Sequence, residues 1–224
     1  MSTHTFGTAT ITLPDLEESG LHLTGIDTLD NPRGAVQDFA FGDADLRSLD
    51  LSDTRLVTGR IHDIRAQHVG FETLNLHGVE ITGSDLRAAR WDESKLTRVV
   101  IRNTKLLGAA LNGLVLHNVL FENCRLDYAT FTKVRATGPV AFAGCVLTEA
   151  TFTHCDLSHV VFSKCGLRLT SFGPGRYRNT DLRGNDLSTV RGVTHFVRVR
   201  IGPGQQHDLT RALVTELDIT VEGD

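Results

Sequence analysis

A bulky apolar side chain recurs every five residues through most of the chain. The series runs from Phe41 to Leu187, with small side chains at Ala66 and Ala136 keeping the register and one extra residue near Gly138. A period of five fits neither the 3.6-residue period of an α-helix nor the two-residue period of a long strand. It fits short extended pieces separated by corners, so that successive coils pair their backbones about 4.8 Å apart. The pattern predicts a β-solenoid held together by stacking of each coil on the next.

The position within each repeat predicts which side chains point inward. If the bulky residue is i, position i−2 is mostly small or β-branched, and positions i−1, i+1 and i+2 are mostly polar. We therefore expect i and i−2 inside the tube and the other three outside. Bulky residues twenty apart should stack, which gives four faces with the following centres: face 1, Phe41, Ile61, Ile81, Ile101, Phe121, Phe142, Phe162, Leu182; face 2, Leu46, Ala66, Leu86, Leu106, Leu126, Leu147, Leu167, Leu187; face 3, Leu51, Phe71, Trp91, Leu111, Phe131, Phe152, Phe172; face 4, Leu56, Leu76, Leu96, Leu116, Ala136, Leu157, Tyr177.

The repeat resembles that of the pentapeptide-repeat family over residues 36–192. The motif A-(D/N)-L-x-x is unbroken at Ala44-Asp45-Leu46 and nearly so at Ser84-Asp85-Leu86 and Cys155-Asp156-Leu157. The resemblance implies an all-β fold, a right-handed quadrilateral β-helix with about 20 residues per coil. The four faces follow from the sequence independently of that resemblance.

The two ends lack the repeat and are expected to cap the solenoid, because an open coil exposes unpaired backbone. Residues 1–35 are predicted to be an N-terminal cap, with a strand over residues 8–13 and a turn over residues 31–34. Residues 193–224 are predicted to form a strand (197–201), an α-helix (about 205–217) and a short strand (219–221).

The C-terminal tail resembles that of bacterial topoisomerase-protecting members of the family. That resemblance implies a homodimer joined through the tail, with Leu209, Leu213 and Leu217 as the dimerisation residues. The alternative, a helix that only caps its own coil, stays open.

The candidate chemistry is sparse. Cys124, Cys145, Cys155 and Cys165 all occupy the inward i−2 position without a CxxC spacing, so we expect buried thiols and no metal site. His154 and His159 fall at outward corners. No nucleophile elbow, phosphate-binding loop or zinc-protease motif is present. The sequence therefore predicts no catalytic residues, no cofactor and a protein that is not an enzyme.

One outward position is apolar where the other faces are charged. On face 1, position i−1 carries Val100, Leu120, Ala141 and Val161 in consecutive coils. A contiguous exposed apolar row marks a contact surface, so we expect these four residues to bind a partner. The alternative is that β-branched residues simply favour strands.

Composition and charge restrict the class of partner. The 224 residues contain no apolar run long enough to span a membrane and no N-terminal signal, so a cytoplasmic protein is expected. The net charge of −4 divides into −5 over residues 1–40, zero over 41–133, +5 over 134–204 and −4 over 205–224. The middle of the chain is thus neither strongly acidic nor strongly basic.

The resemblance implies binding to DNA gyrase as a DNA mimic that protects against quinolones or natural-product topoisomerase poisons. That activity requires an acidic face, whereas the segment charges place acidity only at the ends. The alternative is an interaction scaffold for a different protein partner. Direct nucleic-acid binding is disfavoured because few exposed aromatic residues are expected; its candidate cations are Arg168, Arg176, Arg178, Arg183, Arg191, Arg198 and Arg200.

Overall fold

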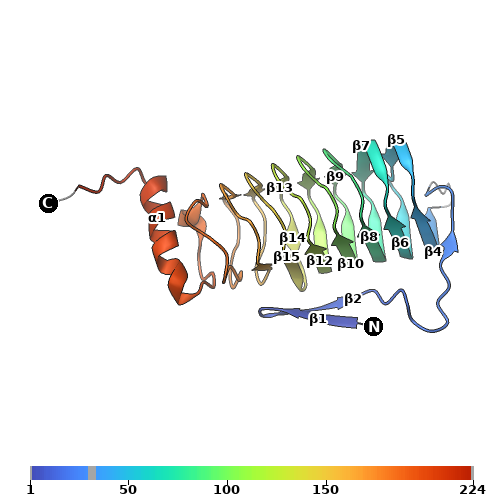
Figure 1. Ribbon diagram of the computed structural model, residues 1–224, viewed down its shortest axis with the longest axis horizontal. Coiled ribbons are helices and arrows are strands. Elements are labelled where there is room, and N and C mark those ends of the chain that lie inside the picture. Colours follow the sequence, from blue (N-terminus) through green and yellow to red (C-terminus); the bar gives the residue numbers. More distant parts are fainter. Residues whose placement is uncertain (1, 30–33, 223–224) are drawn as a thin grey trace.

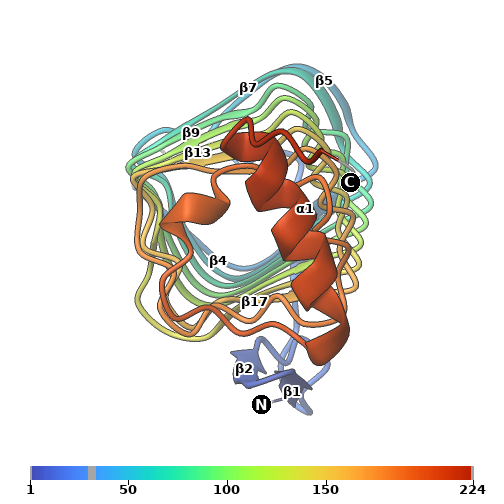
Figure 2. The same ribbon diagram turned by 90° about the vertical axis from the view of Figure 1, so that its left-hand side faces the viewer.

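The computed structural model describes residues 2–29 and 34–222, and it shows a straight rod of stacked coils with a helix across one end (Figure 1). Viewed along the rod, the coils superpose as a four-sided tube (Figure 2). The predicted fold class is confirmed: a parallel β-solenoid of about seven turns with a single C-terminal helix.

Two parallel sheets form the four walls. One sheet carries faces 4 and 1, because each of its long strands bends between two centres, as β6 does between Leu56 and Ile61. The other carries faces 2 and 3. The first sheet contains β3 (Thr24–Gly25), β4 (Ala35–Gly42), β6 (Arg55–His62), β8 (Asn75–Thr82), β10 (Lys95–Arg102), β12 (Val115–Glu122), β14 (Arg135–Ala136), β15 (Val140–Ala143) and β17 (Val161–Ser163). The second contains β5 (Asp45–Asp50), β7 (Arg65–Glu72), β9 (Arg90–Asp92), β11 (Ala110–Asn112), β13 (Thr130–Thr132), β16 (Thr151–Thr153) and β18 (Ser171–Phe172).

Strand register confirms the twenty-residue coil and its single insertion. Leu116 pairs with Ala136, twenty residues on, whereas Val119 pairs with Val140, twenty-one residues on. The extra residue therefore enters between Ala136 and Val140, where the sequence contains Gly138 and Pro139.

Aromatic side chains of faces 1 and 3 meet inside the tube. On face 1, the Phe142 ring stacks between those of Phe121 and Phe162, with centroids 4.7 and 4.9 Å away. It also meets Phe131 and Phe152 of face 3 edge to face. Stacked and T-shaped pairs each add to the burial energy of the rings, so the two opposed aromatic faces interlock into one core.

Side chains at i−2 hydrogen-bond to the coil before. The Cys124 thiol donates to the Ile101 carbonyl at 3.2 Å, and the Thr170 and Thr180 hydroxyls donate to Leu147 and Leu157 carbonyls at 2.7 and 2.8 Å. The small side chain at i−2 thus fits the corner and satisfies a buried carbonyl there.

The N-terminal region has two structurally distinct parts. Residues 24–29 cover the first coil, since β3 pairs with β4 and Leu29 is buried in the core. Residues 2–13 instead form an antiparallel hairpin, β1 (Ser2–Phe6) and β2 (Ala9–Leu13), which lies along the flank of the rod (Figure 1). Of the predicted turn, residues 31–33 lie outside the described residues.

The C-terminal end closes with α1 (Gln206–Glu216), preceded by two 3-10 turns, Val193–His195 and Pro203–Gln205. The Gln205 amide donates to carbonyls of Leu182 and Asn185, at 2.9 and 2.6 Å, which caps exposed backbone of the last coil. The helix prediction is confirmed. The predictions of two flanking strands are wrong: around residue 200 there is one isolated bridge, and residues 219–221 form no strand. Residues 198–200 do pair with the last coil, where the Asn179 amide donates to the Arg198 carbonyl and the Arg200 amide to the Thr180 carbonyl, but the ladder is limited to the one bridge at Arg200.

Among the described residues, no helix is both long and apolar enough to cross a membrane.

Candidate interaction surfaces

The predicted partner row on face 1 is buried rather than exposed. Val100, Leu120, Ala141 and Val161 are each at most 3% accessible. The expectation of an exposed surface was wrong because the chain itself supplies the cover: β2 lies across these four coils. The row and the hairpin form a second, small core separate from the interior of the tube.

The hairpin is seated mainly by apolar packing. Alternate residues of β2, Ala9, Ile11 and Leu13, point onto the row and are buried, while Thr10 between them is exposed. Among the described contacts, polar anchoring is limited: the Thr12 amide donates to Asn118 Oδ1 at 3.1 Å. Within the described parts of the chain, no ladder of backbone hydrogen bonds joins the hairpin to the sheet.

A chain of ion pairs borders the seated hairpin. Glu17, just beyond β2, pairs with Arg60 at 2.9 Å. Arg60 pairs in turn with Glu80 at 3.1 Å, Glu80 with Arg102 at 3.2 Å, and Arg102 with Glu122 at 2.5 Å. These side chains occupy outward positions of face 1 on successive coils, so the segment after the hairpin is tied electrostatically to the solenoid.

Of the three predicted dimerisation residues, one packs against the end coil and two are exposed to solvent. Leu209 is half-buried against the core, whereas Leu213 and Leu217 are 38% and 52% exposed. Ile219 and Val221 beyond the helix are also exposed. The structure therefore leaves an apolar patch at the C-terminal end of the rod, made by Leu213, Leu217, Ile219 and Val221.

Five carboxylates gather on face 3 of the first three coils, a feature that the segment charges did not reveal. On face 3 of these coils, Arg90 is the one outward residue of opposite charge, and none of the five carboxylates forms an ion pair among the described residues. We call this group the acidic ledge: Asp50, Asp53, Glu72, Asp92 and Glu93. Charges summed along the chain combine the acids of face 3 with the cations of face 4. Sorting the residues by face with the stacking register would have revealed the acidic ledge.

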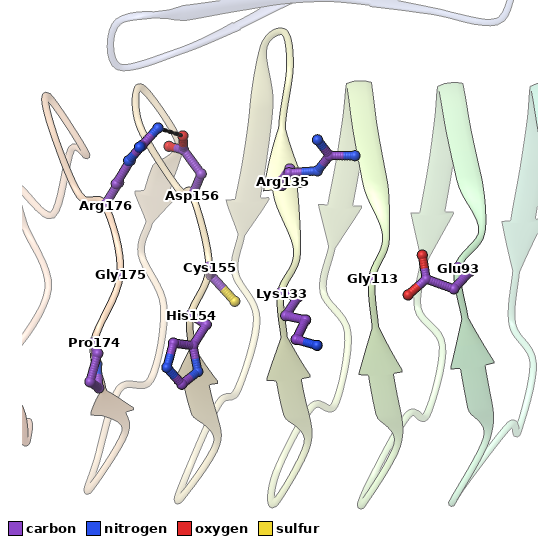
Figure 3. A pocket seen from close by; sticks show the side chains of 10 residues that line it. All are labelled: Glu93, Gly113, Lys133, Arg135, His154, Cys155, Asp156, Pro174, Gly175 and Arg176. Atoms are coloured by element: carbon purple, nitrogen blue, oxygen red, sulfur yellow. Dashed lines mark ion pairs between the residues drawn. The ribbon is translucent and has the colours of Figure 1, made fainter.

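A surface groove with a volume of about 650 Å³ follows the corner between faces 3 and 4. Glu93 and Lys133 lean toward each other across Gly113, and Arg176 pairs with Asp156 at 3.6 Å (Figure 3). The groove is open and charged on both sides. The interior of the tube, by contrast, is filled by side chains.

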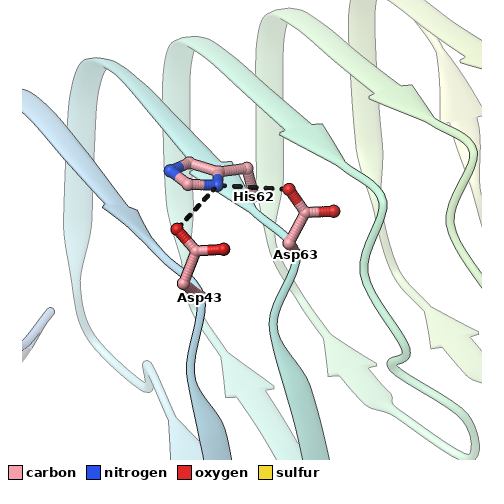
Figure 4. Close-up of side chains that lie close together, drawn as sticks. All are labelled: Asp43, His62 and Asp63. Carbon is pink, nitrogen blue, oxygen red and sulfur yellow. Dashed lines mark hydrogen bonds and ion pairs between the residues drawn. The ribbon is translucent and has the colours of Figure 1, made fainter.

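One cluster has the donor types of a cation site. Asp43, His62 and Asp63 meet at the corner between faces 1 and 2, with His62 Nδ1 3.3 and 3.9 Å from carboxylate oxygens of Asp63 and Asp43 (Figure 4). The imidazole ring lies over Gly42, which has no side chain to obstruct it. These three donors could hold a divalent cation, but the imidazole–carboxylate hydrogen bond already accounts for their proximity. Sequence reasoning missed the cluster because it requires the coil register.

The cysteines match the prediction of buried thiols. All four are free and buried. Burial raises the pKa of the Cys155 and Cys165 thiols to about 11. A thiol with such a pKa stays protonated at neutral pH, which makes it a poor nucleophile and metal ligand.

Residues 114–191 match the family model described as pentapeptide repeat region, so the resemblance found in the sequence is confirmed for this part of the chain. No curated protein matches the chain. Among solved structures, a trypsin-treated form of QnrB1, a plasmid-mediated fluoroquinolone resistance protein, is 22% identical, with 90% of this chain and 98% of that chain covered and a TM-score of 0.41. HetL, a pentapeptide repeat protein involved in heterocyst differentiation regulation in the cyanobacterium Nostoc sp. strain PCC 7120, is 14% identical, with 70% and 88% covered and a TM-score of 0.27.

Proposed function

We propose that this chain, with a pentapeptide repeat region at residues 114–191, is a non-catalytic protein-binding rod and that DNA gyrase is its partner. In this proposal the rod occupies the DNA site of the enzyme as a DNA mimic. It would thereby protect gyrase from quinolones or natural-product poisons, acting in the cytoplasm.

The acidic ledge is the observation that carries this proposal. Its carboxylates project from three consecutive coils, which are spaced about 4.8 Å apart in a rigid sheet. Proteins bind the DNA backbone with cationic surfaces that neutralise a regular row of phosphates. A fixed row of carboxylates with no cation paired to it is complementary to such a surface.

We also propose that the apolar patch at the C-terminal end joins two copies into a homodimer. Leu213 and Leu217 are exposed on one side of α1, while Ala212 on the other side is buried against the last coil. A terminal patch of this kind brings two rods end to end. Such an arrangement would double the length of the surface offered to a DNA-binding enzyme.

The second candidate is an interaction scaffold for a different protein. It is favoured by the apolar row at Val100, Leu120, Ala141 and Val161, which is covered by a hairpin with little polar anchoring. If the hairpin moves aside, these residues become the partner-binding surface that the sequence predicted.

A supercoiling assay with purified gyrase tests the first candidate. The protein is titrated with and without a quinolone, beside a ledge variant, Asp53→Asn/Glu72→Gln/Glu93→Gln, and a matched variant that removes three exposed acids elsewhere, Asp43→Asn/Asp63→Asn/Glu149→Gln. We expect inhibition, or rescue from the drug, at low micromolar protein. The ledge variant should be at least about tenfold weaker, since losing one good charge contact is worth that much. The matched variant should resemble the wild type.

Two results would contradict the gyrase assignment. One is no effect on supercoiling at any protein concentration reached. The other is an equal loss in the two variants, which would reduce the effect to net charge.

A further inference from the structure

Face 4 concentrates positive charge along the whole rod. From Leu56 to Tyr177 its outward positions carry six cations and one acid, Asp156; a second acid, Asp38, lies in the first coil, where Val36 pairs with Leu56. Face 2 also carries six cations, but five acids accompany them, so the two faces differ in acids and not in cations. The cations of face 4 are Arg55, Lys95, Arg98, Arg135, Arg176 and Arg178; those of face 2 are Arg47, Arg65, Arg87, Lys105, Arg125 and Arg168.

Ion pairing differs in the same way. On face 2, Arg65, Arg87, Lys105 and Arg125 each pair with a neighbouring aspartate, at 2.8 to 3.6 Å. On face 4, the only ion pair among the described residues joins Arg176 to Asp156. The positive charge of face 4 is therefore largely unneutralised by the protein.

The pKa of His77 shows that the electrostatic potential on face 4 is positive. Burial lowers its pKa, and the charges of Arg98, Arg55 and Lys95 lower it further. Its Nε2 lies 2.6 Å from Arg98 Nη2, a geometry in which the neutral ring accepts from the guanidinium. The neutral histidine thus adds no positive charge to face 4, and its hydrogen bond holds the Arg98 side chain in place.

The cations form a line. Arg55, Lys95, Arg135 and Arg176 occupy the same i−1 position, and the strand register stacks these positions coil upon coil, with Asn75, Val115 and Asp156 between them. At a coil spacing of about 4.8 Å, the line is about 29 Å long with a cation about every 9.6 Å. All four side chains are exposed.

The surroundings of this line indicate what it binds. Between Arg55 and Arg178, face 4 has no exposed large apolar side chain among the described residues; the exposed Val197 lies one coil beyond, where Asn179 N–H donates to the Arg198 carbonyl. Single-stranded nucleic acids are bound largely by aromatic stacking, which this part of face 4 does not offer, and an acidic protein is the alternative that the test below separates from DNA. A duplex backbone requires only regularly spaced cations on an open surface.

We propose that face 4 binds the phosphate backbone of double-stranded DNA without sequence preference. The line from Arg55 to Arg176 makes the main contacts, and Lys133 in the adjoining groove extends it. This inference is independent of gyrase, since it uses the opposite charge on a different face.

Fluorescence anisotropy with a labelled 20-base-pair duplex and no gyrase present tests the proposal. We expect binding to weaken about 500-fold between 50 and 200 mM salt, if about five phosphates are contacted. The variant Arg55→Gln/Lys95→Gln/Arg135→Gln should bind at least about 50-fold more weakly at 50 mM salt, with the salt slope reduced by about 2.7. The matched variant Arg65→Gln/Arg87→Gln/Lys105→Gln, with the same change in net charge on face 2, should keep wild-type affinity within about threefold.

Three results would overturn the proposal. The first is no binding at 50 mM salt by a protein whose melting temperature shows it to be folded. The second is an equal loss in the two variants. The third is equally tight binding of a polyglutamate peptide, lost in the face 4 variant, which would make an acidic protein the partner. Because the assay contains no gyrase, its outcome and that of the supercoiling assay are distinguishable.

Discussion

At the residue scale, each side chain is constrained by the residue twenty positions away. Gly42 leaves room for the His62 ring, and a Cβ at Gly83 would collide with the Asp63 carboxylate. The hairpin turn, which lies outside the repeat, also approaches the last coils closely: a Cβ at Gly7 would lie 2.8 Å from Asp181 Oδ2. Close approach alone explains glycine at Gly42, whereas Gly7 and Gly83 also have a positive φ, of 52° and 64°, a backbone conformation that favours glycine.

Asp181 is the ionisable residue most dependent on its partner. Its side chain is 3% exposed and accepts two hydrogen bonds from Arg183, at 2.6 and 2.8 Å. The Arg183 hydrogen bond holds the pKa of Asp181 below its usual range, against the opposing effect of burial. A depressed folded-state pKa stabilises the fold above the pKa of the unfolded chain, about 3.9, and this contribution is lost as the pH falls through the folded-state value.

We therefore expect Asp181→Asn to lower the free energy of unfolding at pH 7 by about 1–3 kcal/mol, because it removes a buried charged acceptor. The difference from wild type should shrink as the pH falls below about 4. Urea unfolding at a series of pH values measures both, with Glu149→Gln as a surface control. A difference that is constant with pH would show that the carboxylate charge is not responsible.

At the element scale, the hairpin β1–β2 is a separately folded piece resting on the solenoid. It has its own five-residue ladder, and its contact with the rod is chiefly apolar. The solenoid strands pair without it, so removing it should leave the coils intact. What it removes from water is the apolar row.

We expect Ile11→Asp to release the hairpin, since burying an isoleucine contributes about 1.5–3 kcal/mol and an unpaired carboxylate cannot take its place. Limited proteolysis should then cut residues 2–23 much faster while the solenoid persists. Binding of a hydrophobic dye should rise as the row becomes exposed. Thr10→Asp, on the outer side of β2, is the matched control and should behave as wild type. Unchanged proteolysis of the Ile11 variant would refute this account of the hairpin.

At the scale of the whole molecule, the rod presents different chemistry on each side. Face 1 is covered by the hairpin, the early coils of face 3 carry the acidic ledge, face 4 carries the cations, and the C-terminal end carries the apolar patch. Because parallel stacking makes the tube rigid, these surfaces keep fixed directions relative to one another.

The end patch makes a prediction about association. We expect wild-type protein to sediment as a dimer at micromolar concentration and Leu213→Lys/Leu217→Lys to weaken the dimer at least about 100-fold, because both changes place charge in an apolar contact. Analytical ultracentrifugation over a concentration series measures this, with Tyr128→Lys, an exposed apolar side chain on face 2, as control. A wild-type protein that stays monomeric throughout would mean that α1 only caps its own coil.

The sequence by itself determined the repeat architecture. Each five-residue repeat in the sequence is also one side of a backbone coil. The apolar series from Phe41 to Leu187 therefore predicted the tube, its four faces, the insertion near Gly138 and the buried cysteines. The terminal helix was predicted equally well, because its apolar stripe is a local pattern.

Only the tertiary structure decided what lies on the surface. The hairpin covers the apolar row because Ala9, Ile11 and Leu13 match it in space, and no local pattern links segments about 90 to 150 residues apart. At 197–201 the chain pairs with the last coil only through the Asp181–Arg200 bridge, and at 219–221 no strand forms, because a strand requires pairing over several residues and not only alternation. The opposite charges of faces 3 and 4 disappear when charge is summed along the chain, since each coil passes through both faces. They become visible once the stacking register sorts the residues by face.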